Sequence, residues 1–198
     1  LELGHNAPVH WLVTGANGFL GANAVRVLSR DHRVTAAVRP GRSAPTGDTD
    51  LVSLDFDDAE ALTREILRIN PDVILHCAGM ANHQECALHE DKAMHANSTV
   101  ARSLATAARA ASAVFVYVST DAVFSGSRGW YAEGDDVDPN TAYGRSKAAG
   151  EVAVCEVLPD SIVARTNFFG WSPSGQRSAL EFFVRELEVG NRVPGYVN

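Results

Sequence analysis

A tyrosine and a lysine spaced four residues apart are the first side chains in this sequence that could do chemistry. Tyr143 and Lys147 stand in the run YGRSK. On a helix this spacing places both side chains on one face, one turn apart. A tyrosine with its ordinary pKa of about 10 is a poor acid–base catalyst at neutral pH, and a nearby ammonium lowers that pKa by stabilising the phenolate. The pair could therefore donate a proton, although the same spacing is common on helices without catalytic function.

Two hydroxyl side chains end an apolar run that precedes the tyrosine. Ser119 and Thr120 follow the run 114–118, which is predicted to be a strand. Either hydroxyl could bond the oxygen of a substrate carbonyl and hold it against Tyr143, and the sequence does not decide between them. Lys147 could in addition bond the ribose hydroxyls of a nicotinamide cofactor. The four side chains together predict a site for carbonyl reduction.

A glycine-rich loop near the beginning of the chain predicts nucleotide binding. Three glycines recur at every third position between a predicted strand, 9–14, and a predicted helix, 19–29. The first glycine permits the tight turn, the second leaves room for a pyrophosphate, and the third lets the helix pack closely on the strand. The N-terminus of the helix offers free N–H groups and a positive dipole end to the phosphates. Outside this context the spacing would indicate only a tight turn. The loop residues predicted to bind the cofactor are Gly15, Asn17, Gly18, Phe19, Leu20 and Gly21.

The residues after the second and third predicted strands bear on which cofactor is bound. An acidic residue after the second strand would favour NAD, whereas Arg39 stands there, with Arg42 close behind. A guanidinium can pair with a 2′-phosphate, so we predict NADP, with NAD as the alternative if the arginines are only solvated loop charges. Asp55, followed by Phe56, is placed to accept a hydrogen bond from the adenine amino group. The alternative for Asp55 is to cap the next helix.

Short apolar runs alternate with longer helical patterns, which predicts an α/β fold. Strands that lack polar alternation are typical of parallel strands buried on both faces. We therefore predict a doubly wound parallel sheet, the Rossmann fold, with ligands beyond the C-terminal ends of its strands. The further predicted strands are 34–38, 51–54, 73–76, 114–119 and 162–165. The further predicted helices are 58–70 (capped by Asp57 or Asp58), 91–111, 141–157 and 179–189.

Composition excludes several classes of protein. The chain has 198 residues, 45% of them hydrophobic, which is enough to form a globular core rather than a disordered chain. Its net charge of −7, without a basic block, argues against nucleic acid or a membrane surface as partner. No apolar run approaches the length of a membrane span. Three cysteines, an odd number, indicate free thiols in a reducing compartment, so we expect a soluble, cytoplasmic protein. The spacing of His83, Cys86 and His89 is too weak a signal to predict a metal site.

Together these motifs resemble the extended branch of the short-chain dehydrogenase/reductase superfamily, which acts on nucleotide sugars. The glycine loop has the form T-G-x-x-G-x-x-G, and the tyrosine and lysine have the form Y-x-x-x-K. The run STDAVFSG (119–126) resembles the S-T-D-x-V-F-x-G segment of dTDP-4-dehydrorhamnose reductases and their relatives. YGRSKAAGE (143–151) and ARTNFFG (164–170) resemble two further segments of that group. The resemblance extends from residue 9 to about residue 196.

The resemblance implies a role for each matching residue. Tyr143 would be the proton donor and Lys147 its pKa partner, while Thr120, with Ser119 as competitor, would hold the substrate oxygen. Asn97 falls where the superfamily keeps an asparagine that positions a water beside the lysine. The implied reaction is hydride transfer from NADPH to the ketone carbon of a 4-keto nucleotide sugar, with protonation of the alkoxide. The further residues implied to line the cofactor are Cys77, Ala78, Gly79, Thr166 and Asn167.

The same resemblance leaves alternatives for the function and the domain organisation. Sugar-nucleotide 4-epimerases and dehydratases use the same side chains, and Asp121 after Thr120 fits a dehydratase. A non-catalytic dinucleotide-binding regulatory subunit, like the relatives that modulate methionine adenosyltransferase, shares the STD segment. Ala122 stands where rhamnose-type reductases often carry tyrosine. We expect a dinucleotide-binding domain at 8–170 and the start of a truncated, incomplete substrate-binding lobe at 171–198. Many relatives form homodimers through helices on the sheet face.

Overall fold

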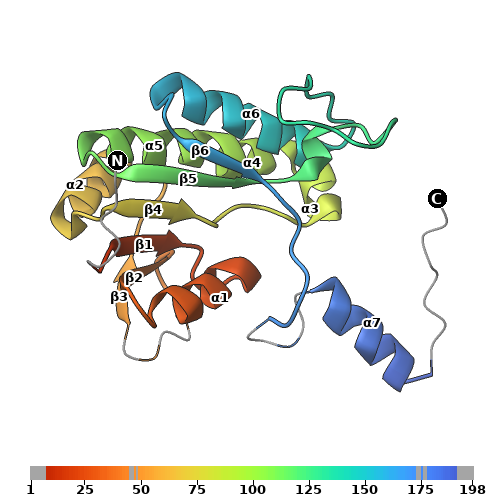
Figure 1. Ribbon diagram of the computed structural model, residues 1–198, viewed down its shortest axis with the longest axis horizontal. Coiled ribbons are helices and arrows are strands. Elements are labelled where there is room, and N and C mark those ends of the chain that lie inside the picture. Colours follow the sequence, from red (N-terminus) through yellow and green to blue (C-terminus); the bar gives the residue numbers. More distant parts are fainter. Residues whose placement is uncertain (1–7, 45–46, 48, 173–174, 176–177, 191–198) are drawn as a thin grey trace.

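Six parallel strands form the central sheet of the computed structural model, which describes residues 8–44, 47, 49–172, 175 and 178–190 (Figure 1). The strands are β1 (His10–Thr14), β2 (Arg33–Val38), β3 (Asp50–Ser53), β4 (Val73–His76), β5 (Val114–Ser119) and β6 (Ile162–Arg165). Their order across the sheet is β3-β2-β1-β4-β5-β6, and every neighbouring pair is parallel. The strand order reverses direction between β1 and β4. In such a sheet the crevice for a ligand lies at that point, outside the C-terminal ends of the strands.

Helices cover both faces of the sheet. α2, α5 and α6 contact one another on one face, and α1 lies apart from them against β1 and β2 (Figure 1). After β6 the chain passes the C-terminal ends of the strands as an extended segment and leads to α7 (Figure 1). The longer helices are α1 (Phe19–Leu28), α2 (Ala59–Ile69), α5 (Val100–Ala110), α6 (Ala142–Val157) and α7 (Ala179–Glu188). The shorter ones are α3 (His83–Leu88), α4 (Glu90–Met94), a π-helical turn (His95–Thr99) and a 3₁₀ turn (Asp121–Val123).

Side chains from the two faces of the sheet fill two separate apolar cores. Leu12 and Ile74 are fully buried in the core that α2, α5 and α6 share with the sheet. Val13, the next residue along β1, is fully buried in the other core, against Val25 of α1. Because successive side chains of a strand point to opposite faces, burial of both explains the uninterrupted apolar runs in the sequence. The prediction of a doubly wound parallel sheet is confirmed.

The element boundaries follow local capping residues. Asp58, and not Asp57, caps α2 by accepting hydrogen bonds from two backbone N–H groups of its first turn. α2 ends at Asn70, whose left-handed backbone (φ 48°) stops the helix before Pro71. Thr141 caps α6. The strand ends lie within one residue of the predictions.

The helix predicted at 91–111 is present, with one local departure from the α-helical pattern. The structure is helical from α4 through the π-helical turn to α5 without a gap, and the pattern did not predict the π-helical turn. Separately, α3 lies in a segment for which no full helix was predicted. Of the predicted lobe at 171–198, residues 173–174, 176–177 and 191–198 lie outside the described residues, and so do residues 1–7 of the chain. In the part of the chain that the structure describes, no helix is long and apolar enough to span a membrane.

Candidate active site

The glycine loop brings the end of β1 against the end of β4. Gly15 has φ +67°, and a Cβ on it would stand 2.7 Å from the backbone nitrogen of Ala78. Gly18 closes the turn by donating from its backbone N–H to the carbonyl of Gly15 at 2.8 Å. A Cβ on Gly21 would collide with that same carbonyl oxygen. The positions of Gly15 and Gly21 therefore need glycine so that α1 can begin directly beside the crevice.

A cleft runs along the ends of the strands at this point. A cavity of about 280 Å³ at the glycine loop and one of about 1030 Å³ beside it share four residues: Arg39, Phe56, Ala78 and Gly79. Their combined size is ample for a dinucleotide, since small-molecule sites occupy roughly 300–1,000 Å³. Nine of the residues predicted to bind cofactor line the cleft: Gly15, Asn17, Gly18, Arg39, Asp55, Phe56, Cys77, Ala78 and Gly79. The other residues predicted to bind the cofactor are not among its lining residues: Phe19, Leu20, Gly21, Tyr143, Lys147, Thr166 and Asn167.

Asp55 lies in the cleft and does not cap a helix. Its carboxylate accepts a hydrogen bond from the backbone N–H of Asp57 at 3.0 Å, while Asp58 caps α2. Arg39, at the end of β2, lines both cavities, and Arg42 lines the smaller one. The cleft therefore has two arginines beside its glycine loop and a carboxylate farther along.

Tyr143 lies half-buried at the first turn of α6, beside this cleft. Burial raises the pKa of its hydroxyl, and the nearby side chain of Thr120 acts in the opposite direction. The imidazole ring of His83 packs against the tyrosine ring, with 4.7 Å between ring centroids. Tyr143 is therefore protonated at neutral pH, which is the state that a proton donor needs.

The structure separates the two candidate hydroxyls at the end of β5. Ser119 donates a hydrogen bond to the carboxylate of Glu151. Thr120 instead lies near Tyr143; its Oγ1 accepts a hydrogen bond from the backbone N–H of Ala122 at 3.1 Å and donates to the exposed carboxylate of Asp121 at 3.2 Å. Because the Ser119 hydroxyl is bound to a buried carboxylate, the geometry favours Thr120 as the group that would hold a substrate oxygen.

Lys147 lies one turn after Tyr143, with its ammonium in the interior. Its Nζ donates to the carbonyl of Val118 at 2.7 Å and lies 4.0 Å from the centre of the Tyr117 ring. Burial lowers the pKa of Lys147 to about 8, although Glu151 acts to raise it. Lys147 is not among the groups that shift the pKa of Tyr143 in this structure. Its role as the pKa partner of the tyrosine therefore stays a prediction.

Asn97 joins the cleft to the helix that carries Tyr143. Its side-chain amide accepts from the backbone N–H of Met80 and donates to the carbonyl of Met80 and to Ser146 of α6, all at 2.8–2.9 Å. Its backbone carbonyl, within the π-helical turn, accepts from the hydroxyl of Tyr117 at 2.8 Å. The predicted water relay at Asn97 stays a prediction, because its side chain is bound to protein groups here.

Two further side chains near the site were not predicted. His76, at the end of β4, is 1% exposed, and its Nδ1 lies 2.7 Å from the hydroxyl of Thr14. Burial lowers the pKa of His76 to about 3. Glu151 follows Lys147 by one helical turn, so its spacing in the sequence could have indicated it. Within the described residues, no group of three or more potential metal ligands comes together.

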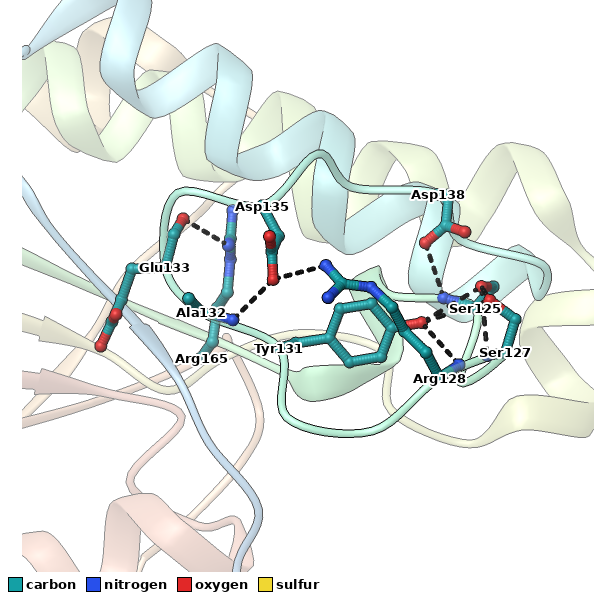
Figure 2. A network of polar contacts seen from close by, with 9 residues as sticks. All are labelled: Ser125, Ser127, Arg128, Tyr131, Ala132, Glu133, Asp135, Asp138 and Arg165. Atoms are coloured by element: carbon teal, nitrogen blue, oxygen red, sulfur yellow. Dashed lines mark hydrogen bonds and ion pairs between the residues drawn. The ribbon is translucent and has the colours of Figure 1, made fainter.

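The loop between β5 and α6 is held by its own polar contacts (Figure 2). Asp135 pairs with Arg128 and accepts from the backbone N–H of Ala132, each at 2.7 Å. Asp138 accepts from the backbone N–H of Ser125 at 2.8 Å. These two solvent-accessible aspartates therefore hold the loop.

The fold and the site together define a dinucleotide-binding protein of the short-chain dehydrogenase/reductase type. The family model described as RmlD substrate binding domain matches residues 9–191, and the chain belongs to this family. The dTDP-4-dehydrorhamnose reductase of Streptomyces griseus is 38% identical over 152 residues, which are 76% of this chain and 46% of that protein. Methionine adenosyltransferase 2 subunit beta of Bos taurus is 33% identical over 184 residues, 91% of this chain and 53% of that one.

A solved structure agrees with these similarities. The dTDP-4-dehydrorhamnose reductase of Bacillus anthracis, in complex with NADP, superposes with a TM-score of 0.78 at 25% identity. The match covers 94% of this chain and 62% of that one. The chain spans about half the length of the curated relatives it matches.

Proposed function

We propose that this chain contributes the NADP-binding and proton-donating part of a reductase of 4-keto nucleotide sugars, similar to the dTDP-4-dehydrorhamnose reductases. The observation that carries the proposal is that Tyr143 and Thr120 lie close together near a dinucleotide-sized cleft. Related reductases that match this chain support the substrate class. A relative in complex with NADP supports the cofactor, and NAD is the alternative.

The cofactor would lie along the cleft described above. Backbone N–H groups of the glycine loop and the start of α1 would bind the pyrophosphate. Arg39 would pair with the 2′-phosphate of NADP, and Asp55 would accept from the adenine amino group. Thr166 and Asn167, after β6, would border the nicotinamide. Lys147 would bond the nicotinamide ribose through the ammonium that now donates to Val118.

In the proposed reaction the ketone gains two hydrogens, a hydride from the cofactor and a proton from the protein. Bound NADPH would supply a hydride to the ketone carbon. Thr120 holds the carbonyl oxygen by a hydrogen bond, and Tyr143 gives its proton to that oxygen as negative charge develops there, which completes the alcohol. The Lys147 ammonium stabilises the phenolate that remains. Preorganised donors at a developing oxyanion are where most of the barrier lowering arises. Asn97 supports this arrangement by fixing Met80 to α6.

A second candidate function follows from the similarity to methionine adenosyltransferase 2 subunit beta. In that case the chain would bind a dinucleotide as a subunit of another enzyme without reducing a sugar. A dehydratase is less favoured, because the Asp121 carboxylate accepts from the side-chain amide of Asn167 at 2.6 Å and is not free to act as an acid. A homodimer through the outer helices is part of the proposal.

Replacement of Tyr143 by phenylalanine tests the proposal. We expect the wild-type protein to oxidise NADPH in the presence of a dTDP-4-keto-6-deoxy sugar. The variant should lose turnover by about 10²- to 10⁴-fold, the usual contribution of a general acid, with NADPH affinity nearly unchanged. Tyr131→Phe, which removes a hydroxyl from the loop, is the control and should leave turnover intact. NADPH binding without wild-type turnover would favour the second candidate, and turnover that survives Tyr143→Phe would disprove the assigned donor.

A further inference from the structure

Glu151 is a buried carboxylate that the proposed reaction does not use. It lies on α6 one turn after Lys147 and two turns after Tyr143, so the three side chains share one face of the helix. Glu151 is only 6% exposed. A buried charge is costly unless other groups pair with it, so its partners indicate its purpose.

Two strands fix the carboxylate of Glu151 in place. Arg165 of β6 donates to it from Nε at 3.1 and 3.2 Å and from a terminal nitrogen at 2.8 Å. Ser119 of β5 donates to it as well. Arg165 is itself anchored, because it donates to the backbone carbonyl of Glu133 at 3.2 Å (Figure 2). Its guanidinium also lies over the ring of Phe124. The carboxylate therefore has little freedom to move.

Glu151 in turn acts on the Lys147 ammonium, which is only 5% exposed. Burial disfavours the charged lysine, and Glu151 is the largest influence in the opposite direction. The thiol of Cys77 also acts on the ammonium, but burial raises its pKa to about 12, so it is neutral at pH 7. His76 is neutral too, because its pKa is about 3. The remaining contacts of the ammonium are the carbonyl of Val118 and the ring of Tyr117.

We infer that Glu151, fixed by Arg165 and Ser119 one helical turn from Lys147, is a positioning residue that keeps the buried Lys147 ammonium charged. The use of that ammonium in catalysis rests on the proposed function, whereas its charge is a property of the free protein. Arg165 accordingly has a structural role, because its guanidinium is bound to Glu151 and to the carbonyl of Glu133.

The chain contains two lysines, Lys92 and Lys147, which makes the test direct. Protein labelled with ¹³C at the lysine ε-carbon gives one NMR signal from each, and the signals are followed against pH without cofactor or substrate. We expect the wild-type Lys147 midpoint near pH 8. Glu151→Gln should lower that midpoint by about one pH unit or more, because an opposite charge at close range shifts a pKa by about 1–3 units. Exposed Lys92 serves as the internal reference.

Matched variants keep the result interpretable. Glu156→Gln removes the same charge from the same helix, but from an exposed pair with Arg102, and should leave the Lys147 midpoint unchanged. If Glu151→Gln does not fold, Glu151→Gln combined with Arg165→Met removes both buried charges and should still lower the midpoint. An unchanged Lys147 midpoint in the folded variant would overturn the inference. Because the titration needs no turnover, absence of reductase activity would count against the proposed function alone.

Discussion

Replacement of His76 by asparagine should remove a large part of the protein's sensitivity to acid. In the folded protein the pKa of His76 is lowered to about 3, mainly because the side chain is buried and also because the positive charge of Lys147 acts on it. In the unfolded chain the pKa is about 6.5. Between these values the unfolded state binds a proton that the folded state does not, so stability falls as the pH falls. Each pH unit in this window costs about 1.4 kcal/mol, which gives about 3 kcal/mol between pH 6.5 and 4.

Urea unfolding at a series of pH values measures this loss. The free energy of unfolding of the wild-type protein should fall by about 3 kcal/mol more than that of His76→Asn over this range, a large share of the roughly 5–15 kcal/mol of a typical domain. The asparagine amide can still bond the hydroxyl of Thr14. Lowered pKa values at Asp135 and Asp138 affect both proteins equally and cancel in the difference. His89→Asn, at an exposed position, should keep the wild-type slope. Equal pH slopes in wild type and His76→Asn would refute the reasoning.

Three further predictions concern the cleft and the site. Arg39→Ala should weaken NADPH binding by about 10- to 100-fold, which is the usual contribution of a charge-assisted hydrogen bond, and should weaken NADH binding far less. Equal losses of NADPH and NADH affinity in calorimetric titrations would contradict the pairing of Arg39 with the 2′-phosphate. Thr120→Val should lower kcat by about 10²- to 10³-fold, and Thr120→Ser should restore much of that loss. Ser119→Ala should instead lower the free energy of unfolding by about 1–3 kcal/mol and have little effect on kcat. A large loss of kcat in Ser119→Ala, with kcat nearly unchanged in Thr120→Val, would show that Ser119 holds the substrate oxygen instead of Thr120. Gly15→Ala should abolish NADPH binding because the added Cβ meets the backbone at Ala78, and binding at wild-type affinity would show that the loop does not approach the cofactor.

The sheet could be predicted from the sequence because its strands are buried on both faces. β4, β5 and β6 begin and end at the predicted residues, since an apolar run bounded by polar or turn residues leaves few alternatives. The glycine loop was equally predictable, because the close approach at Gly15 and Gly21 is a local requirement of a strand–turn–helix unit. These features depend on residues near one another in the sequence.

The features that were missed depend on distant residues. The π-helical turn within the predicted helix 91–111 contains Asn97, which bonds Met80 and Ser146, and neither contact has a signal in the helical pattern. The choice between Ser119 and Thr120 depends on Glu151, which is 32 positions from Ser119 in the sequence. Tertiary contacts of this kind override local preference, and a single sequence does not display them.

The most direct measurement is a crystal structure of the protein with NADPH bound. The account predicts that the pyrophosphate lies on the N–H groups of the glycine loop and that the Lys147 ammonium bonds the nicotinamide ribose. It also predicts that the hydroxyls of Tyr143 and Thr120 converge beside the C4 atom of the nicotinamide. A dinucleotide bound with its nicotinamide away from Tyr143, or a bound state in which Lys147 still donates to Val118 alone, would contradict it.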